Sequence, residues 1–167
     1  PKVSCTLERP GYYPAGGGRF KVTVEPAGRL APLEIPERGE LKQRHAQAIV
    51  CQLSENIAKR ELQVVQKMLN WDMSTLETLV SKESHGPGNV LIIEMAFEKM
   101  TEIFTGFGER GVSAEEVARN ACHEAREYLT SGAPVGKHLA DQLLLPLVMA
   151  GKGSFLTMPP SRHTMTN

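Results

Sequence analysis

The strongest constraint on the fold comes from residues 38–130, where the spacing of apolar side chains changes several times. Residues 43–53, with an apolar centre, predict a strand, and the helical spacing that follows predicts an amphipathic helix ending near Trp71. Three further strand-like segments follow at residues 75–83, 89–95 and 101–107, the last two as an antiparallel pair. A second helix runs to about Leu129. Because the order strand, helix, three strands, helix is complete in itself, we expect one folding unit here.

Two serines mark the expected helix starts. Ser54 can accept a hydrogen bond from an exposed amide of the first helical turn. Ser113 is followed three residues later by Glu116, which is the pattern of a capping box, in which each side chain satisfies one loose amide. Gly132-Ala133-Pro134 predicts the end of the second helix.

The segment before this unit is rich in glycine and then becomes strand-like. Phe20, Val22 and Val24 alternate with polar residues, which predicts a strand with one buried face. Residues 26–39 contain several prolines and glycines and predict a connector.

The segment after this unit is mostly apolar. Residues 135–150 predict a helix and residues 154–158 a short strand, which Pro159-Pro160 ends. The last residues follow that strand without a closing element, and the first residue is a proline, so we expect a piece of a longer polypeptide. The expected sections are residues 1–37 and 134–167, lying together as parts of one core, with residues 38–133 as an inserted domain.

Strands and helices occur in roughly equal measure and do not strictly alternate, which predicts an α+β protein built of mixed α/β layers, and the composition is that of an ordinary globular protein. The chain is 41% hydrophobic and 23% charged, with a net charge of zero, which argues against a broad RNA-coating surface but permits a local basic site. The longest apolar run, residues 143–150, is far shorter than the roughly 20 residues of a membrane span, and the first residues do not show the charged, apolar and small-residue pattern expected of a signal peptide. We expect no membrane association and a cytoplasmic location.

The three cysteines have no CxxC spacing and are expected to be free thiols, buried or half-buried.

Two of the five histidines have a context that suits phosphate chemistry. His138 opens a helix that also carries Asp141 and Gln142, and a helix start offers unpaired amides and a partial positive charge. His163 follows Ser161 and Arg162, and an imidazole can attack phosphorus and leave again. The arginine can offset phosphate charge. The simpler alternative is a solvated histidine near a chain end.

The other histidines, His45, His85 and His123, are expected in surface or structural positions. No HxH or HExxH motif and no His-plus-Cys cluster is present. The sequence therefore assigns no metal ligands within this chain.

Five motif blocks resemble the RNA 3′-terminal phosphate cyclase family, in the family's order and over nearly the whole chain. The blocks are Gly11-Tyr12-Tyr13-Pro14-Ala15-Gly16-Gly17-Gly18, Gly86-Pro87-Gly88-Asn89, Thr105-Gly106-Phe107-Gly108-Glu109-Arg110-Gly111-Val112-Ser113-Ala114-Glu115, His138-Leu139-Ala140-Asp141-Gln142-Leu143 and Pro160-Ser161-Arg162-His163-Thr164-Met165-Thr166-Asn167. The resemblance implies a core of repeated βαβαββ units, partial here, with a small inserted domain of thioredoxin-like topology.

The resemblance also implies a reaction. A histidine, matching His163, would take AMP from ATP, pass it to an RNA 3′-phosphate, and the 2′-hydroxyl would then close a 2′,3′-cyclic phosphate. Mg²⁺ or Mn²⁺ would assist. We expect the nucleotide to bind at His138, Asp141, Gln142, Ser161 and Arg162. The expected partners are ATP, RNA 3′-phosphate ends and the missing amino-terminal part of the same protein, without which this chain is expected to be inactive.

One position departs from the family pattern. Bacterial members have a tyrosine that stacks on adenine at the place of His138, and a histidine offers less stacking area. Two alternative functions can be compared with this one. A non-catalytic cyclase-like ribosome-assembly factor lacks the nucleophilic histidine, which His163 argues against, and the block around His163 gives no support to an enolpyruvyl transferase.

Overall fold

The structure is a computed structural model that describes residues 2–166, with every side chain in that range except that of His163. The elements of this range are β1 Lys2–Arg9, β2 Arg19–Glu25, β3 Leu33–Ile35, β4 Leu41–Cys51, α1 Glu55–Leu69, the 3-10 helix η1 Met73–Thr75, β5 Leu76–Ser81, β6 Gly88–Phe97, β7 Thr101–Phe107, α2 Ala114–Ser131, α3 Lys137–Ala150, β8 Gly153–Phe155 and α4 Arg162–Thr166. None of the described helices is long and apolar enough to cross a membrane.

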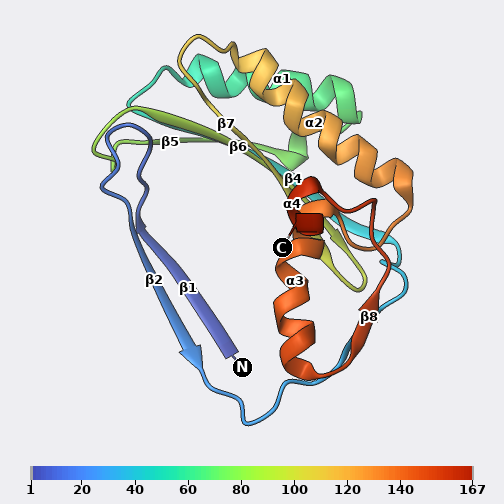
Figure 1. The fold of residues 1–167 in the computed structure, drawn as a ribbon. Helices are drawn as coiled ribbons and strands as arrows, with labels where there is room; N and C mark the ends of the chain where they lie inside the picture. The colour runs from blue at the N-terminus through green and yellow to red at the C-terminus, as the bar shows by residue number, and fades with distance from the viewer. Residues whose placement is uncertain (1, 167) are drawn as a thin grey trace.

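A mixed four-stranded sheet in the order β5-β4-β6-β7 forms the centre of the molecule. β4 and β5 run parallel and are connected through α1, whereas β6 pairs antiparallel with both β4 and β7. α1 and α2 lie side by side over one face of this sheet (Figure 1). The predicted order of elements in this unit and the antiparallel pair are therefore confirmed.

The main core fills the space between this sheet and its two helices. Every second residue of β6 and β7 is buried there, as strand alternation requires. The fully buried side chains include Ala46, Ala48, Val50, Ala58, Val65, Leu91, Ile93, Met95, Ala118, Cys122, Ala125 and Tyr128. The amphipathic character expected of the first helix is confirmed, and α2 buries one face in the same way.

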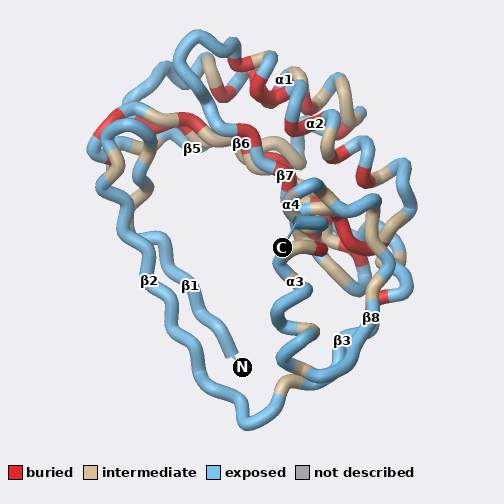
Figure 2. Tube along the Cα trace, in the orientation of Figure 1, coloured by how far each residue is buried: buried red, intermediate tan, exposed pale blue. Residues whose placement is uncertain are grey.

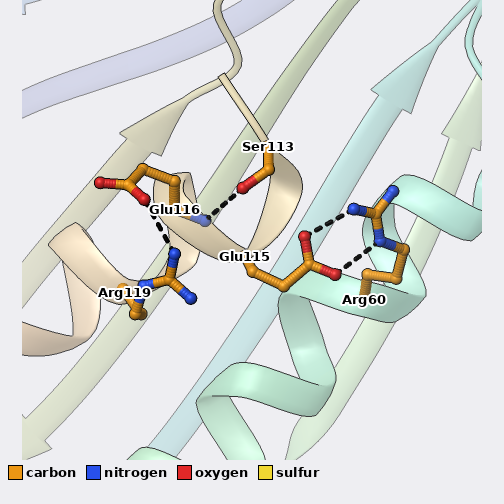
Figure 3. A network of polar contacts seen from close by, with 5 residues as sticks. All are labelled: Arg60, Ser113, Glu115, Glu116 and Arg119. Carbon is orange, nitrogen blue, oxygen red and sulfur yellow. Dashed lines mark hydrogen bonds and ion pairs between the residues drawn. The ribbon is translucent and has the colours of Figure 1, made fainter. Parts of the chain in front are cut away.

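The predicted serine caps are present at both helices. The Ser54 hydroxyl accepts from the Asn56 amide at 3.3 Å, and the Ser113 hydroxyl accepts from the Glu116 amide at 3.2 Å. The second half of the capping box is wrong, because the Glu116 carboxylate accepts from Arg119 at 2.8 Å instead of reaching back to its cap (Figure 3).

The two helices are also joined by an ion pair near the start of α2. The Arg60 guanidinium of α1 donates to both oxygens of Glu115, at 2.7 and 2.5 Å (Figure 3). These hydrogen bonds lower the pKa of the Glu115 carboxyl to about 2. The pair fixes how the helices meet rather than adding much stability, because both groups are solvated.

The opening segment is a β-hairpin, β1 paired with β2, and this corrects the expected buried strand. Val3, Cys5 and Leu7 pair across the hairpin with the three apolar residues of β2, so all six share one face. Every residue of β2 is nevertheless exposed, because the hairpin projects away from the sheet and no described layer covers it (Figure 2). Cys5 is exposed for the same reason, whereas the other two cysteines are buried free thiols as predicted.

A second, smaller core lies beside α3. The expected connector contains β3, which pairs in parallel with β8 although the two strands are more than a hundred residues apart. Ile35, Val135 and Ala140 are buried here, with Phe155 packed against them. α3 starts two residues later than predicted because Val135 forms a bridge with Thr157.

The chain's last described residues form α4, which corrects the expectation of an end without a closing element. α4 packs against α3, near the end at which α3 begins (Figure 1).

Candidate functional site

The start of α3 is held by hydrogen bonds from several surrounding segments. The Tyr128 hydroxyl, fully buried on α2, donates to the Pro134 carbonyl at 2.9 Å. The Val135 carbonyl accepts from the Met158 amide and from the Thr157 hydroxyl. The backbone that enters α3 is therefore fixed before the helix begins.

Glu102 of β7 continues this set of contacts at the cap residue of α3. Glu102 is only 4% exposed, and its carboxylate accepts from the Gly136 amide at 2.5 Å. Glycine suits this position because a β-carbon there would lie 3.0 Å from both carboxylate oxygens. Burial raises the pKa of Glu102, and the Gly136 amide and nearby His138 partly offset that rise.

Glu124 of α2 binds the next two residues of the chain. One of its carboxylate oxygens lies 3.2 Å from the Lys137 ammonium and the other 3.5 Å from the His138 Nε2 atom. Three consecutive residues at the start of α3 are thus bound by two carboxylates of the central unit.

A cavity of about 640 Å³ opens between β7, α2 and the start of α3. It is lined by Thr101, Glu102, Ile103, Phe104, Thr105, Glu124, His138, Leu139 and Gln142. The structure therefore brings together two residues predicted for nucleotide binding, His138 and Gln142. Asp141 is half-buried on the same helix.

The other predicted residues lie on the adjacent helix. The Ser161 hydroxyl caps α4 by accepting from the Thr164 amide at 3.2 Å, and Arg162 is exposed. Neither residue lines the 640 Å³ cavity. The backbone of His163 belongs to α4, but its side chain lies outside what the structure describes, so its predicted role stays a prediction.

Sequence reasoning missed Glu102 and Glu124 as site residues. Glu102 carried a usable signal, because it occupies a buried position in the alternation of β7, between residues that face solvent. A carboxylate in an apolar slot predicts a specific donor nearby. Glu124 carried no such signal, since a glutamate at the edge of the exposed face of a helix is commonplace.

A second cavity, of about 930 Å³, lies where three of the motif blocks meet. Residues 11–14 of the glycine-rich segment, residues 87–89 and residues 107–110 line it. The Tyr12 ring lies directly against Gly88, where a β-carbon would overlap it. Burial, together with a hydrogen bond to the Cys51 thiol, raises the pKa of Tyr12 to about 12. The glycine-rich segment is therefore anchored on the central unit by an uncharged phenol.

Among the described side chains, no three His, Cys, Asp or Glu residues come together as a metal site.

The insert-domain model of RNA 3′-terminal phosphate cyclase matches residues 36–130. The chain belongs to the RNA 3′-terminal phosphate cyclase family. The match spans the sheet β5-β4-β6-β7 together with α1 and nearly all of α2, so Glu102 and Glu124 lie in the insert domain and α3 follows it.

Curated relatives named RNA 3′-terminal phosphate cyclase are similar over almost the whole chain. The protein from Koribacter versatilis is 46% identical over 100% of this chain and 47% of its own length. The protein from Pseudomonas fluorescens is 45% identical over 99% of this chain and 48% of its own length. The protein from Salmonella enteritidis is 41% identical over 97% of this chain and 47% of its own length. The chain spans about half the length of these relatives.

Proposed function

We propose that this chain is the nucleotide-binding part of an ATP-dependent enzyme that converts an RNA 3′-phosphate to a 2′,3′-cyclic phosphate. The observation that carries the proposal is the packing of α4, which bears His163, against α3, which bears His138, Asp141 and Gln142. The family membership and the relatives' names support the same reaction.

The proposed reaction has three steps. An imidazole nitrogen of His163 attacks the α-phosphorus of ATP, the α–β phosphoanhydride bond breaks, and pyrophosphate leaves. An oxygen of the RNA 3′-phosphate then attacks the same phosphorus and releases the histidine. Finally the neighbouring 2′-hydroxyl attacks the RNA phosphorus, loses its proton and displaces AMP, which closes the cyclic phosphate.

The roles of the other residues follow from their positions. The His138 side chain is 64% exposed at the cavity mouth, so one face of its ring can stack on a base. Gln142 lines the same cavity and can hydrogen-bond a base edge. Arg162 supplies a positive charge beside His163 for the α-phosphate, and Ser161 fixes the turn that presents both residues.

A divalent ion, Mg²⁺ or Mn²⁺, neutralises phosphate charge when it is bound with ATP. The described residues of this chain do not gather carboxylates or histidines for it. We assign its protein ligands to the amino-terminal region that the resemblance implies.

That region is also the proposed partner for the exposed apolar faces of this chain. The face of the hairpin that carries Val22 and Phe20 and the outer side of α3, with Val148 76% exposed, lack a covering layer among the described residues. Burying such faces is favourable in proportion to their area.

The proposal is tested with a polypeptide of the relatives' length that contains this sequence. Incubation with ATP labelled at the α-phosphorus and with Mg²⁺ is expected to give an acid-labile protein-bound label, and His163→Ala is expected to give none. His123→Ala, exposed on α2, is the matched control and should label as the unaltered protein does. Equal labelling of His163→Ala would refute the role of His163.

The alternative is a non-catalytic cyclase-like protein that binds RNA or assists ribosome assembly. It predicts no label on the unaltered protein at any metal concentration.

A further inference from the structure

Both carboxylates that hold the start of α3 come from the insert domain. Glu102 lies on β7 and Glu124 on α2, within residues 36–130. The residues they bind, Gly136 to His138, begin the helix that carries the proposed nucleotide site. The insert domain therefore touches that site through specific polar contacts and not merely through chain connectivity.

We propose that Glu102 and Glu124 are positioning residues for ATP, through which the insert domain sets the place and direction of the first turn of α3. This inference rests on the proposed function.

Glu102 contacts the backbone at the start of α3, whereas Glu124 contacts side chains there. Glu102 is buried and binds the backbone amide of the cap residue, so it fixes where the helix begins. Glu124 is partly exposed, and its two oxygens lie 3.2 Å from the Lys137 ammonium and 3.5 Å from the His138 Nε2 atom, so it favours one direction for each of these side chains. A helix start has no internal acceptor for its first amides, and Gly136 has no side chain that would cap them. External acceptors are therefore needed here.

The geometry also explains why a histidine can serve at this position. A free histidine ring rotates about its side-chain bonds, and ordering it on binding costs free energy. A carboxylate oxygen 3.5 Å from Nε2 can pair with the imidazole when it is protonated, which limits the directions of a ring that also lines the cavity. Glu124 thus pre-orders the ring that is expected to stack on the base.

The test compares ATP kinetics of matched variants in a polypeptide of the relatives' length. Glu124→Gln keeps the shape of the side chain but removes its charge, and is expected to raise KM for ATP about fivefold, with kcat nearly unchanged. Glu127→Gln, on an exposed part of the same helix, is the control and should leave KM unchanged. A variant that only loosened the fold would lower kcat and thermal stability together without this division between KM and kcat.

A second pair of variants tests the buried contact. Glu102→Leu removes the acceptor for the Gly136 amide and is expected to raise KM for ATP about tenfold. Glu102→Gln retains a carbonyl oxygen and should stay within about twofold of the unaltered protein, because the hydrogen bond can still form. If Glu102→Leu does not fold, the comparison of Glu124→Gln with Glu127→Gln decides the matter.

Hydrogen exchange over residues 135–143 supplies a readout that does not depend on turnover. Faster exchange in Glu124→Gln, without ATP, is expected, since the first turn of α3 loses an anchor. If the unaltered protein labels with ATP but KM for ATP is unchanged in Glu124→Gln, the positioning role is overturned and the proposed function stands. Absence of labelling in the unaltered protein overturns the proposed function and this inference with it.

Discussion

At the scale of single residues, Glu61 is the least compensated group in the core. It lies on the inner face of α1 and is fully buried. One carboxylate oxygen accepts from the Asn89 amide at 2.9 Å, while the other has no hydrogen-bond partner among the described residues. Burial raises its pKa to about 7, and the bond from Asn89 only partly opposes that rise.

This burial predicts that stability falls as the pH rises. The folded protein holds the Glu61 proton up to a pH of about 7, whereas the unfolded chain releases it near the usual value of 4.5. Between these values the folded state binds more protons, so the free energy of unfolding decreases with rising pH, by up to about 3 kcal/mol from this residue. Urea unfolding at pH 5 and pH 7.5 measures the decrease.

Glu61→Gln, which mimics the protonated acid, should lose most of this pH dependence and be the more stable protein at pH 7.5. The exposed Glu127→Gln should keep it. If the stability of Glu61→Gln changed with pH as steeply as that of the unaltered protein, the carboxyl would not be titrating as described.

The burial of Glu61 could be predicted from the sequence, but its hydrogen-bond partner could not. It belongs to the helical spacing that places Ala58, Leu62 and Val65 inside, so the pattern puts a carboxylate in the core. What the sequence does not state is its partner, because Asn89 of β6 lies 28 residues further along the chain and meets Glu61 only where α1 packs on the sheet.

At the scale of elements, the start of α2 shows how a local signal fixes a helix boundary. The Ser113 hydroxyl satisfies the Glu116 amide, and Glu115 in the first turn reaches across to Arg60 (Figure 3). The first is a contact between near neighbours, which the sequence predicted. The second depends on α1 lying beside α2, which it did not.

Ser113→Ala is expected to lower the free energy of unfolding by about 1 kcal/mol, because the cap acceptor is lost. Ser113→Asn should be nearly neutral, since asparagine caps as well as serine does. Chemical unfolding at neutral pH measures both. Equal losses in the two variants would mean that the hydroxyl contributes something other than an acceptor.

At the scale of the whole molecule, the apolar face of the hairpin is the feature that most needs a partner. Val22 is 48% exposed there, on β2, whose alternating pattern predicted a buried face (Figure 2). The pattern correctly identified which side chains share a face, but the layer that would cover that face is not among the described elements.

Val22→Glu should therefore change the unfolding free energy of this 167-residue chain by no more than about 0.5 kcal/mol, as for other surface substitutions. In a polypeptide of the relatives' length, where we propose that the face is covered, it should cost about 2 kcal/mol or more, because a charge would be buried. Thr23→Glu, on the polar face, is the control. A small effect in both polypeptides would contradict the proposed covering layer.

The sequence alone determined what depends on near neighbours: the helices and strands of the insert domain, their serine caps, and the motif blocks that indicated the family. Tertiary structure decided which distant residues meet, including β3 with β8 and Glu102 with Gly136, 34 positions away. The reason is that side-chain spacing reports the two faces of one element, whereas a contact across elements depends on the order of strands in the sheet and on how the helices lie over it. The anchored start of α3 is such a contact.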